Sequence, residues 1–155
     1  VATSGAILLK PGAIRLLKER LLPLAALVTP NLDEAEILVG RKLECLADLE
    51  NAAREIHRRF GCAALVKGGH LRSLPAATDV FFDGRKMLRL VAPFVQGVST
   101  HGTGCTYSAA ITAFLARGDT LPDAVVAAKR YITRAIQGSY RAGRHTVLQH
   151  GLARR

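Results

Sequence analysis

The stretch Gly102-Thr103-Gly104-Cys105 has the residue types and spacing of a site for anion chemistry. It stands where an irregular, glycine-containing segment gives way to an Ala-rich segment with the composition of a helix. Two glycines allow the backbone to approach a ligand closely, and the N–H groups at a helix start carry partial positive charge. Such a turn favours phosphate oxygens and the charge on a phosphoryl group in transfer. The pattern therefore predicts an oxyanion site at residues 102–105.

Cys105 falls in the first turn of this predicted helix. The helix dipole favours a thiolate over a thiol at that position, so the sulfur can accept a proton. A hydroxyl nucleophile held near the glycines would lose its proton to Cys105 as it attacks the terminal phosphorus of ATP. The spacing alone leaves a second interpretation open, in which a small buried cysteine fills a gap between a helix and a sheet.

The elements that must position these residues alternate between short apolar runs and helical patterns. We expect buried strands at residues 25–28 and 62–66, because both runs are short, continuous and apolar. A hairpin is expected around Asp83-Gly84, with strands at residues 80–82 and 87–91. Apolar periodicity predicts helices at residues 11–22, 33–39, 46–60, 106–116 and 122–140. This alternation predicts an α/β fold in one domain, and the hairpin makes the sheet mixed.

Composition argues against several classes of protein. The formal charge of +10 is scattered along the chain and Trp is absent, so we expect no nucleic-acid partner. A basic nucleic-acid-binding module is kept as an alternative. No apolar run approaches the roughly 20 residues of a membrane span, so we expect no membrane association and a cytoplasmic location. The three cysteines have no CxxC spacing, which predicts neither a disulfide framework nor a zinc site.

Gly102-Thr103-Gly104-Cys105 resembles the anion-hole signature of the ribokinase-like vitamin kinases, in which Cys stands where sugar kinases of that superfamily carry an Asp base. Three further stretches are similar to the hydroxymethylpyrimidine/phosphomethylpyrimidine kinases of thiamine biosynthesis: Thr29-Pro30-Asn31 with Glu34-Ala35, Val66-Lys67-Gly68-Gly69-His70, and Ser99-Thr100-His101. The similarity extends from Val1 to Tyr140. It implies a ribokinase-like three-layer αβα fold, with a mostly parallel sheet plus a β-hairpin, and catalytic roles for Gly102, Thr103, Gly104 and Cys105.

The resemblance also implies a binding site for Mg2+ and ATP. Asn31 and Glu34 resemble the Asn-x-x-Glu motif of the family, which helps to hold the magnesium and the phosphates through bound water; helix capping by Asn31 is the alternative. Lys67 and Gly69 resemble the Lys-Gly-Gly-His stretch of the family, which implies a place beside the nucleotide. A solvated lysine at a turn is the alternative there. Thr100 and His101 are expected to line the same side of the site.

The implied function is ATP-dependent phosphorylation of a small pyrimidine, hydroxymethylpyrimidine, and then of its monophosphate. Related vitamin kinases of hydroxyethylthiazole or pyridoxal share parts of this layout, and a non-catalytic nucleotide- or phosphate-binding fragment is a second class of function. Family members carry an N-terminal portion with several central strands, which this sequence lacks. We therefore expect either that the sequence is part of a larger native protein, or that the open sheet edge is covered by partner chains in a homo-oligomer, a dimer. Residues 1–144 are expected to form the C-terminal portion of a kinase domain, followed by a basic tail at residues 145–155.

Overall fold

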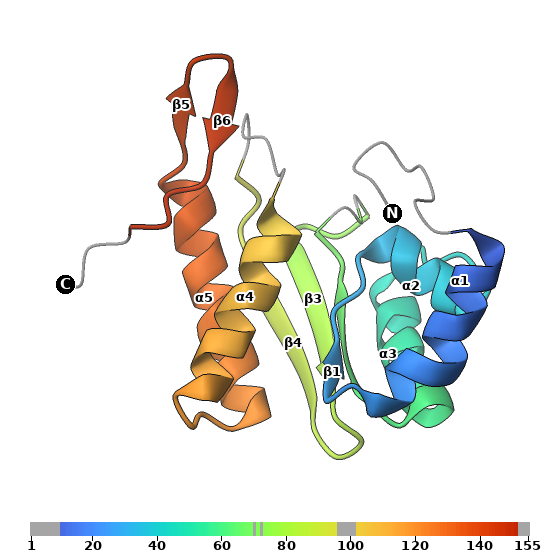
Figure 1. Cartoon of the computed structure of the whole chain (residues 1–155). Coiled ribbons are helices and arrows are strands. Elements are labelled where there is room, and N and C mark those ends of the chain that lie inside the picture. The colour runs from blue at the N-terminus through green and yellow to red at the C-terminus, as the bar shows by residue number, and fades with distance from the viewer. Residues whose placement is uncertain (1–9, 70, 72, 96–101, 152–155) are drawn as a thin grey trace. The chain divides into compact units, whose positions relative to one another are not determined.

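The computed structural model describes residues 10–69, 71, 73–95 and 102–151 (Figure 1). The chain divides into two compact units, Val1–Ala92 and Pro93–Arg155, and each is described by itself. Predicted site residues Thr100 and His101 lie outside the described residues.

The described part of the first unit contains three α-helices and four strands. The helices are α1 (Pro11–Leu16), α2 (Leu32–Val39) and α3 (Leu46–Phe60), and the strands are β1 (Leu27–Val28), β2 (Ala63–Lys67), β3 (Ala77–Phe82) and β4 (Met87–Ala92). The helical path of α1 continues through a π-helical turn, η1 (Leu17–Leu21), and a 3-10 turn, η2 (Leu22–Leu24). Helices α2 and α3 end at Gly40 and Gly61, whose φ angles of 82° and 75° are left-handed. The expected boundary of the helix at residues 46–60 is confirmed.

The four strands form one mixed sheet in the order β1-β2-β3-β4. Strand β1 runs parallel to β2, with Leu27 opposite Ala63, while β2 with β3 and β3 with β4 are antiparallel. The hairpin around Asp83-Gly84 is therefore confirmed. Only one of the three described strand pairs is parallel, so this sheet is less parallel than we expected. Parallel neighbours need a crossover of about a dozen residues or more, and the link at residues 68–76 is shorter than that.

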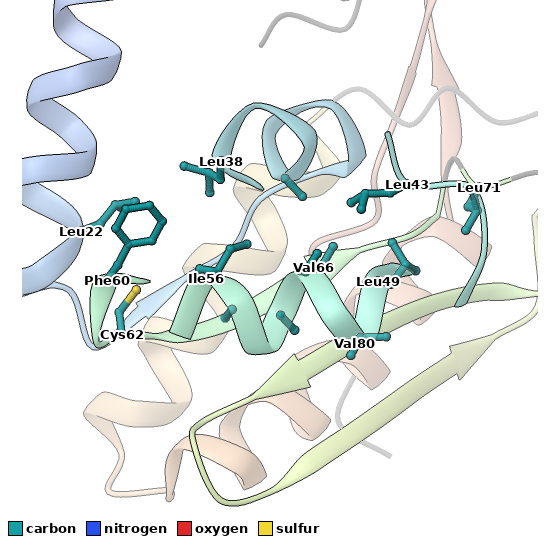
Figure 2. Packing of buried hydrophobic residues seen from close by; sticks show 14 residues of the cluster. Leu22, Leu38, Leu43, Leu49, Ile56, Phe60, Cys62, Val66, Leu71 and Val80 are labelled. Carbon is teal, nitrogen blue, oxygen red and sulfur yellow. The ribbon is translucent and has the colours of Figure 1, made fainter. Parts of the chain in front are cut away.

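The core of the first unit lies between α3 and the sheet. Residues at helical spacing on α3 are fully or nearly buried, namely Leu49, Ala52, Ala53, Ile56 and Phe60. Val66 of β2 and Val80 of β3 belong to the same cluster, and Figure 2 shows Leu22, Phe60 and Cys62 together at one end of it. Burial of each large aliphatic side chain stabilises the fold by about 1.5–3 kcal/mol. Burial also raises the pKa of the Cys62 thiol.

The second unit contains α4 (Thr103–Ala116), α5 (Leu121–Gln137), β5 (Tyr140–Ala142) and β6 (His145–Val147). The prediction that the last helix reaches residue 140 is wrong, because the chain turns at Gly143 (φ 60°) to pair β5 with β6. The Gln149 N–H donates to Ala135 O at 3.0 Å. The division between residues 1–144 and a tail at 145–155 stays a prediction, and β6 lies on the tail side of it. None of the helices in the described ranges has the length and apolar character of a membrane span.

Candidate active site

The glycine turn forms the N-terminus of α4 in the second unit. Gly102 is the N-cap residue, with a left-handed φ of 81° that disfavours a residue with a Cβ. The helix begins at Thr103, earlier than the predicted start at Thr106, and the Thr106 N–H donates to Gly102 O at 2.9 Å. The amides of Thr103, Gly104 and Cys105 therefore precede the first intrahelical bond and point out of the helix end. This is the geometry predicted for an oxyanion site.

Cys105 is exposed in the first turn of α4, whereas Cys62 is buried. The alternative of a cysteine that fills a gap between helix and sheet thus describes Cys62 and not Cys105. Next to Cys105, the Thr103 Oγ1 is buried and has no hydrogen-bond partner among the residues that the structure describes. The helix N-terminus therefore brings three amides, a hydroxyl and a sulfur into one turn.

Asn31 and Glu34 form a capping box at the start of α2 in the first unit. The Asn31 Oδ1 accepts from the Glu34 N–H and the Glu34 Oε2 accepts from the Asn31 N–H, both at 2.8 Å. The capping that we kept as an alternative to metal binding is therefore present. Each of these bonds uses one oxygen, and a carboxylate can accept about four hydrogen bonds. The cap fixes the direction of both side chains without excluding a second role.

Strand β2 brings Lys67 to the same end of the sheet as the capping box of Asn31 and Glu34. Asn31 and Lys67 form an isolated parallel bridge, and the Lys67 N–H donates to Pro30 O at 2.9 Å. Both residues stand at the carboxyl ends of neighbouring parallel strands, where ligands bind in open α/β sheets. The structure therefore brings Asn31, Glu34 and Lys67 together, although residues 31 and 67 are far apart in the chain.

Sequence reasoning missed Asp79, a buried residue of β3. Its Oδ1 accepts a hydrogen bond from the Gly68 N–H at 3.1 Å, and Asp79 lies opposite Lys67 in the strand register. A Cβ at Gly68 would overlap Thr78 O and the Leu49 side chain, so this position requires glycine for space. Aspartate is depleted in strands, so its presence within Ala77–Phe82 was the signal that could have found it.

The described residues contain no group of three or more His, Cys, Asp or Glu side chains that could hold a metal ion by themselves. Mg2+ keeps several of its waters and is bound through one or two carboxylates together with substrate phosphates. The oxygen atoms of Asn31 and Glu34 fit that mode of binding. They do not fit a metal that needs a complete cage of protein ligands.

An open groove of about 590 Å³ runs along the second unit. Its lining is mostly apolar and comes from α4, α5 and the segment after β6: Cys105, Thr106, Ala109, Ala110, Ala113, Phe114, Arg117, Tyr131 and His150. Only Cys105 and Thr106 belong to the first turn of α4. The groove therefore reaches the glycine turn, but most of its surface offers little to a phosphate.

Comparison with known proteins gives matches over nearly the whole chain. Residues 1–150 match the phosphomethylpyrimidine kinase family. The hydroxymethylpyrimidine/phosphomethylpyrimidine kinase of Rhizobium meliloti is 50% identical over 142 residues, which cover 91% of this chain and 53% of that protein. The thiamine biosynthesis bifunctional protein of Geobacter sulfurreducens is 47% identical over 154 residues, or 99% of this chain and 31% of that protein.

Solved structures of vitamin kinases have the same fold. The pyridoxal kinase from Staphylococcus aureus in complex with AMP-PCP and pyridoxal has a TM-score of 0.86 and 34% identity, over 95% of this chain and 55% of that one. The phosphomethylpyrimidine kinase from Clostridium difficile 630 has a TM-score of 0.73 and 36% identity, over 88% and 54%. The chain thus spans about half the length of the Rhizobium kinase and of both solved kinases. The expected ribokinase-like α/β fold is confirmed. The chain belongs to the phosphomethylpyrimidine kinase family.

Proposed function

We propose that this chain is the nucleotide- and phosphate-handling part of a kinase that phosphorylates hydroxymethylpyrimidine and its monophosphate with ATP. The observation that carries the proposal is the exposed Cys105 in the first turn of α4, directly after the left-handed turn at Gly102. The names of the relatives from Rhizobium meliloti and Geobacter sulfurreducens support thiamine biosynthesis as the setting.

In the proposed reaction, Cys105 acts as the general base. The substrate hydroxyl gives its proton to Cys105 Sγ while its oxygen attacks the terminal phosphorus of ATP, and ADP leaves with the electrons of the broken P–O bond. The N–H groups of Thr103, Gly104 and Cys105 donate to the oxygens of the transferred phosphoryl group and stabilise its charge. Because these amides are fixed by the start of α4, they need no rearrangement as the charge develops.

Within the first unit, the residues at the ends of β1 and β2 are proposed to bind the nucleotide. Asn31 and Glu34 would hold a hydrated Mg2+, which neutralises negative charge on the phosphates when it is bound. Lys67 adds a point charge at the end of the neighbouring strand. Gly69, Thr100 and His101 are proposed to line the nucleotide.

We also propose that the protein works as a homodimer in the cytoplasm, without nucleic acid or membrane partners. In the described sheet β1 is an edge strand. An open strand edge is prone to pair with another chain unless it is covered. Light scattering on the purified protein tests this part of the proposal, and a monomer at micromolar concentration contradicts it.

The test of the function is ADP release from Mg-ATP with hydroxymethylpyrimidine as acceptor, together with calorimetric titration of ATP. Pyridoxal must be assayed in parallel, because the pyridoxal kinase from Staphylococcus aureus has the higher TM-score of the two solved kinases. Hydroxyethylthiazole completes the set. Turnover with hydroxymethylpyrimidine supports the proposal. Faster turnover with pyridoxal would make pyridoxal the proposed substrate instead of hydroxymethylpyrimidine. Nucleotide binding without turnover of any acceptor favours a non-catalytic binding fragment.

A further inference from the structure

Asp79 is a buried carboxylate that the proposed reaction does not use. Only 4% of the residue is exposed. It lies in β3 directly opposite Lys67, the last residue of β2, in the antiparallel register. Removing a carboxylate from water is unfavourable unless it is hydrogen-bonded or paired with a charge. An aspartate in this place is therefore expected to hold a particular group beside it.

One group that it holds is the backbone of Gly68, whose N–H donates to Asp79 Oδ1 at 3.1 Å. Gly68 is pressed against its surroundings as well, since a Cβ there would overlap Thr78 O and the Leu49 side chain. The turn then closes with the Leu71 N–H donating to Gly68 O at 2.9 Å. Close packing and two hydrogen bonds thus fix the backbone directly after Lys67.

Lys67 is held from the opposite side by the end of β1. Its N–H donates to Pro30 O at 2.9 Å, and Asn31 pairs with it in a parallel bridge. The backbone from Lys67 to Gly69 therefore lies between the capping box of α2 and the carboxylate of Asp79. A shift of this segment would move Lys67 away from Asn31 and Glu34.

We propose that Asp79 is a positioning residue for nucleotide binding. By holding the Gly68 N–H, its carboxylate sets the direction in which Lys67 and Gly69 face the phosphates of ATP. The inference rests on the proposed kinase function. Because Asp79 acts through the backbone of Gly68, its loss should weaken nucleotide affinity and leave the chemical step nearly unchanged.

Two variants of Asp79 test this role in the protein that shows turnover. Asp79→Ala removes the acceptor, and we expect the KM for ATP to rise about tenfold, because a hydrogen bond to a charged group contributes an effect of that size. We expect kcat to change by less than about threefold, as for a loss of uniform binding. Asp79→Asn keeps an oxygen acceptor in place, so the KM should rise only about threefold. A purely structural role would instead lower kcat through the amount of folded enzyme and leave the KM unchanged.

Thr78→Val is the matched control, because Thr78 is a buried neighbour on the same strand and points to the other face of the sheet. Its Oγ1 donates to Ala76 O at 3.2 Å. We expect this variant to keep the wild-type KM for ATP. If Asp79→Ala does not fold, Asp79→Asn decides the question by itself.

Calorimetric titration with ADP measures the same step without turnover, and its dissociation constant should follow the KM for ATP. Unchanged KM and ADP affinity in every folded Asp79 variant would overturn the inference, while wild-type turnover would leave the proposed function standing. A wild-type protein that neither binds ADP nor releases it from ATP overturns the proposed function, and the inference with it.

Discussion

Asn31 and Lys67 are held by contacts that reach across the first unit, whereas Cys105 is placed by the local geometry of one helix end in the second. The two strand-end residues meet only because β1 and β2 pair in parallel. The position of Cys105 depends only on the start of α4, because Cys105 lies two residues after Thr103, the first residue of that helix. Changes to the core of the first unit should therefore act through stability. Changes at the turn before Cys105 should act on chemistry with little loss of stability.

The interiors of the two units differ in the same sense. The first contains large side chains such as Leu49, Ile56 and Val66, all with no exposed surface. In the second, alanines at positions 110, 124, 128 and 135 are buried beside larger side chains such as Ile111, Val125 and Ile132. Stabilisation by burial follows the apolar area removed from water. Among the described residues, most of the largest fully buried side chains, such as Phe81, Leu49 and Ile56, belong to the first unit, so we expect burial to stabilise that unit more.

The largest effect that we expect is on the chemical step, and it tests whether Cys105 acts on chemistry rather than on stability. We expect Cys105→Ala to lower turnover by about 100- to 10,000-fold, the usual contribution of a general base. ATP affinity should stay within about twofold, because the amides of the helix start are retained. The measurements are ADP release and calorimetric titration of ATP.

Cys62→Ala is the matched control, since Cys62 is the buried cysteine of the first unit. Its loss should lower the free energy of unfolding and leave turnover per folded molecule unchanged. Equal turnover in wild type and Cys105→Ala would remove Cys105 from the reaction.

A core truncation in each unit measures how unequal the two interiors are. Replacing a buried Ile by Ala costs about 2–5 kcal/mol, with the larger values where the cavity cannot collapse. We expect the loss for Ile56→Ala to lie near the upper end of this range, because Ile56 has no exposed surface in the cluster between α3 and the sheet. Ile132→Ala in α5 should lie near the lower end. Urea unfolding followed by circular dichroism gives both values, and a larger loss for Ile132→Ala contradicts the comparison.

The local features were the ones that the sequence could predict. Helix α3 was expected with its correct bounds because it has a regular apolar stripe and stops at a glycine. The hairpin followed from Asp83-Gly84, and the turn before α4 followed from the glycines at positions 102 and 104, although their spacing left a buried Cys105 open. The start of α4 was placed too late, because Gly104 and Cys105 are poor helix formers. They are tolerated in the first turn, where the N–H groups need no intrahelical partner.

The long-range features could not be predicted. Strand β1 is only Leu27–Val28, and its register with β2 decides that Asn31 faces Lys67. No local pattern carries that register. The hydrogen bond from Gly68 to Asp79 depends in the same way on how β2 and β3 pair. The β5–β6 hairpin was missed because each of its strands has only three residues, too few to show an alternating apolar pattern.

A smaller effect separates the two roles of Asn31. Asn31→Ala removes the side-chain half of the capping box, and we expect a loss of about 1 kcal/mol in the free energy of unfolding. Asn31→Ser should restore that stability, because serine is also a good cap. If Asn31 binds Mg2+ as proposed, half-maximal turnover of Asn31→Ser should still require more Mg2+ than that of wild type. An equal Mg2+ requirement would make Asn31 a cap alone.

The smallest effect concerns the pH dependence of the first unit. The hydrogen bond from the Lys86 N–H at 2.7 Å is the main cause that lowers the pKa of Asp83. Burial opposes it, and the hydrogen bond from the Arg85 N–H at 2.9 Å adds to the lowering. A carboxyl group with a lower pKa in the folded state stabilises the fold above its unfolded pKa of about 3.9. That contribution is lost as the pH falls through the folded pKa.

Asp83→Asn keeps an oxygen acceptor for the turn but removes the titration. We expect it to lower the free energy of unfolding by less than about 1 kcal/mol at pH 7, since Asp83 is partly exposed. The difference in the free energy of unfolding between this variant and the wild type should shrink below about pH 4. Hydrogen exchange of β3 and β4 amides between pH 3 and pH 7 locates the effect in the hairpin. A gap of equal size at pH 3 and pH 7 would show that the charge of Asp83 adds nothing, and the hairpin would then depend on its turn and packing alone.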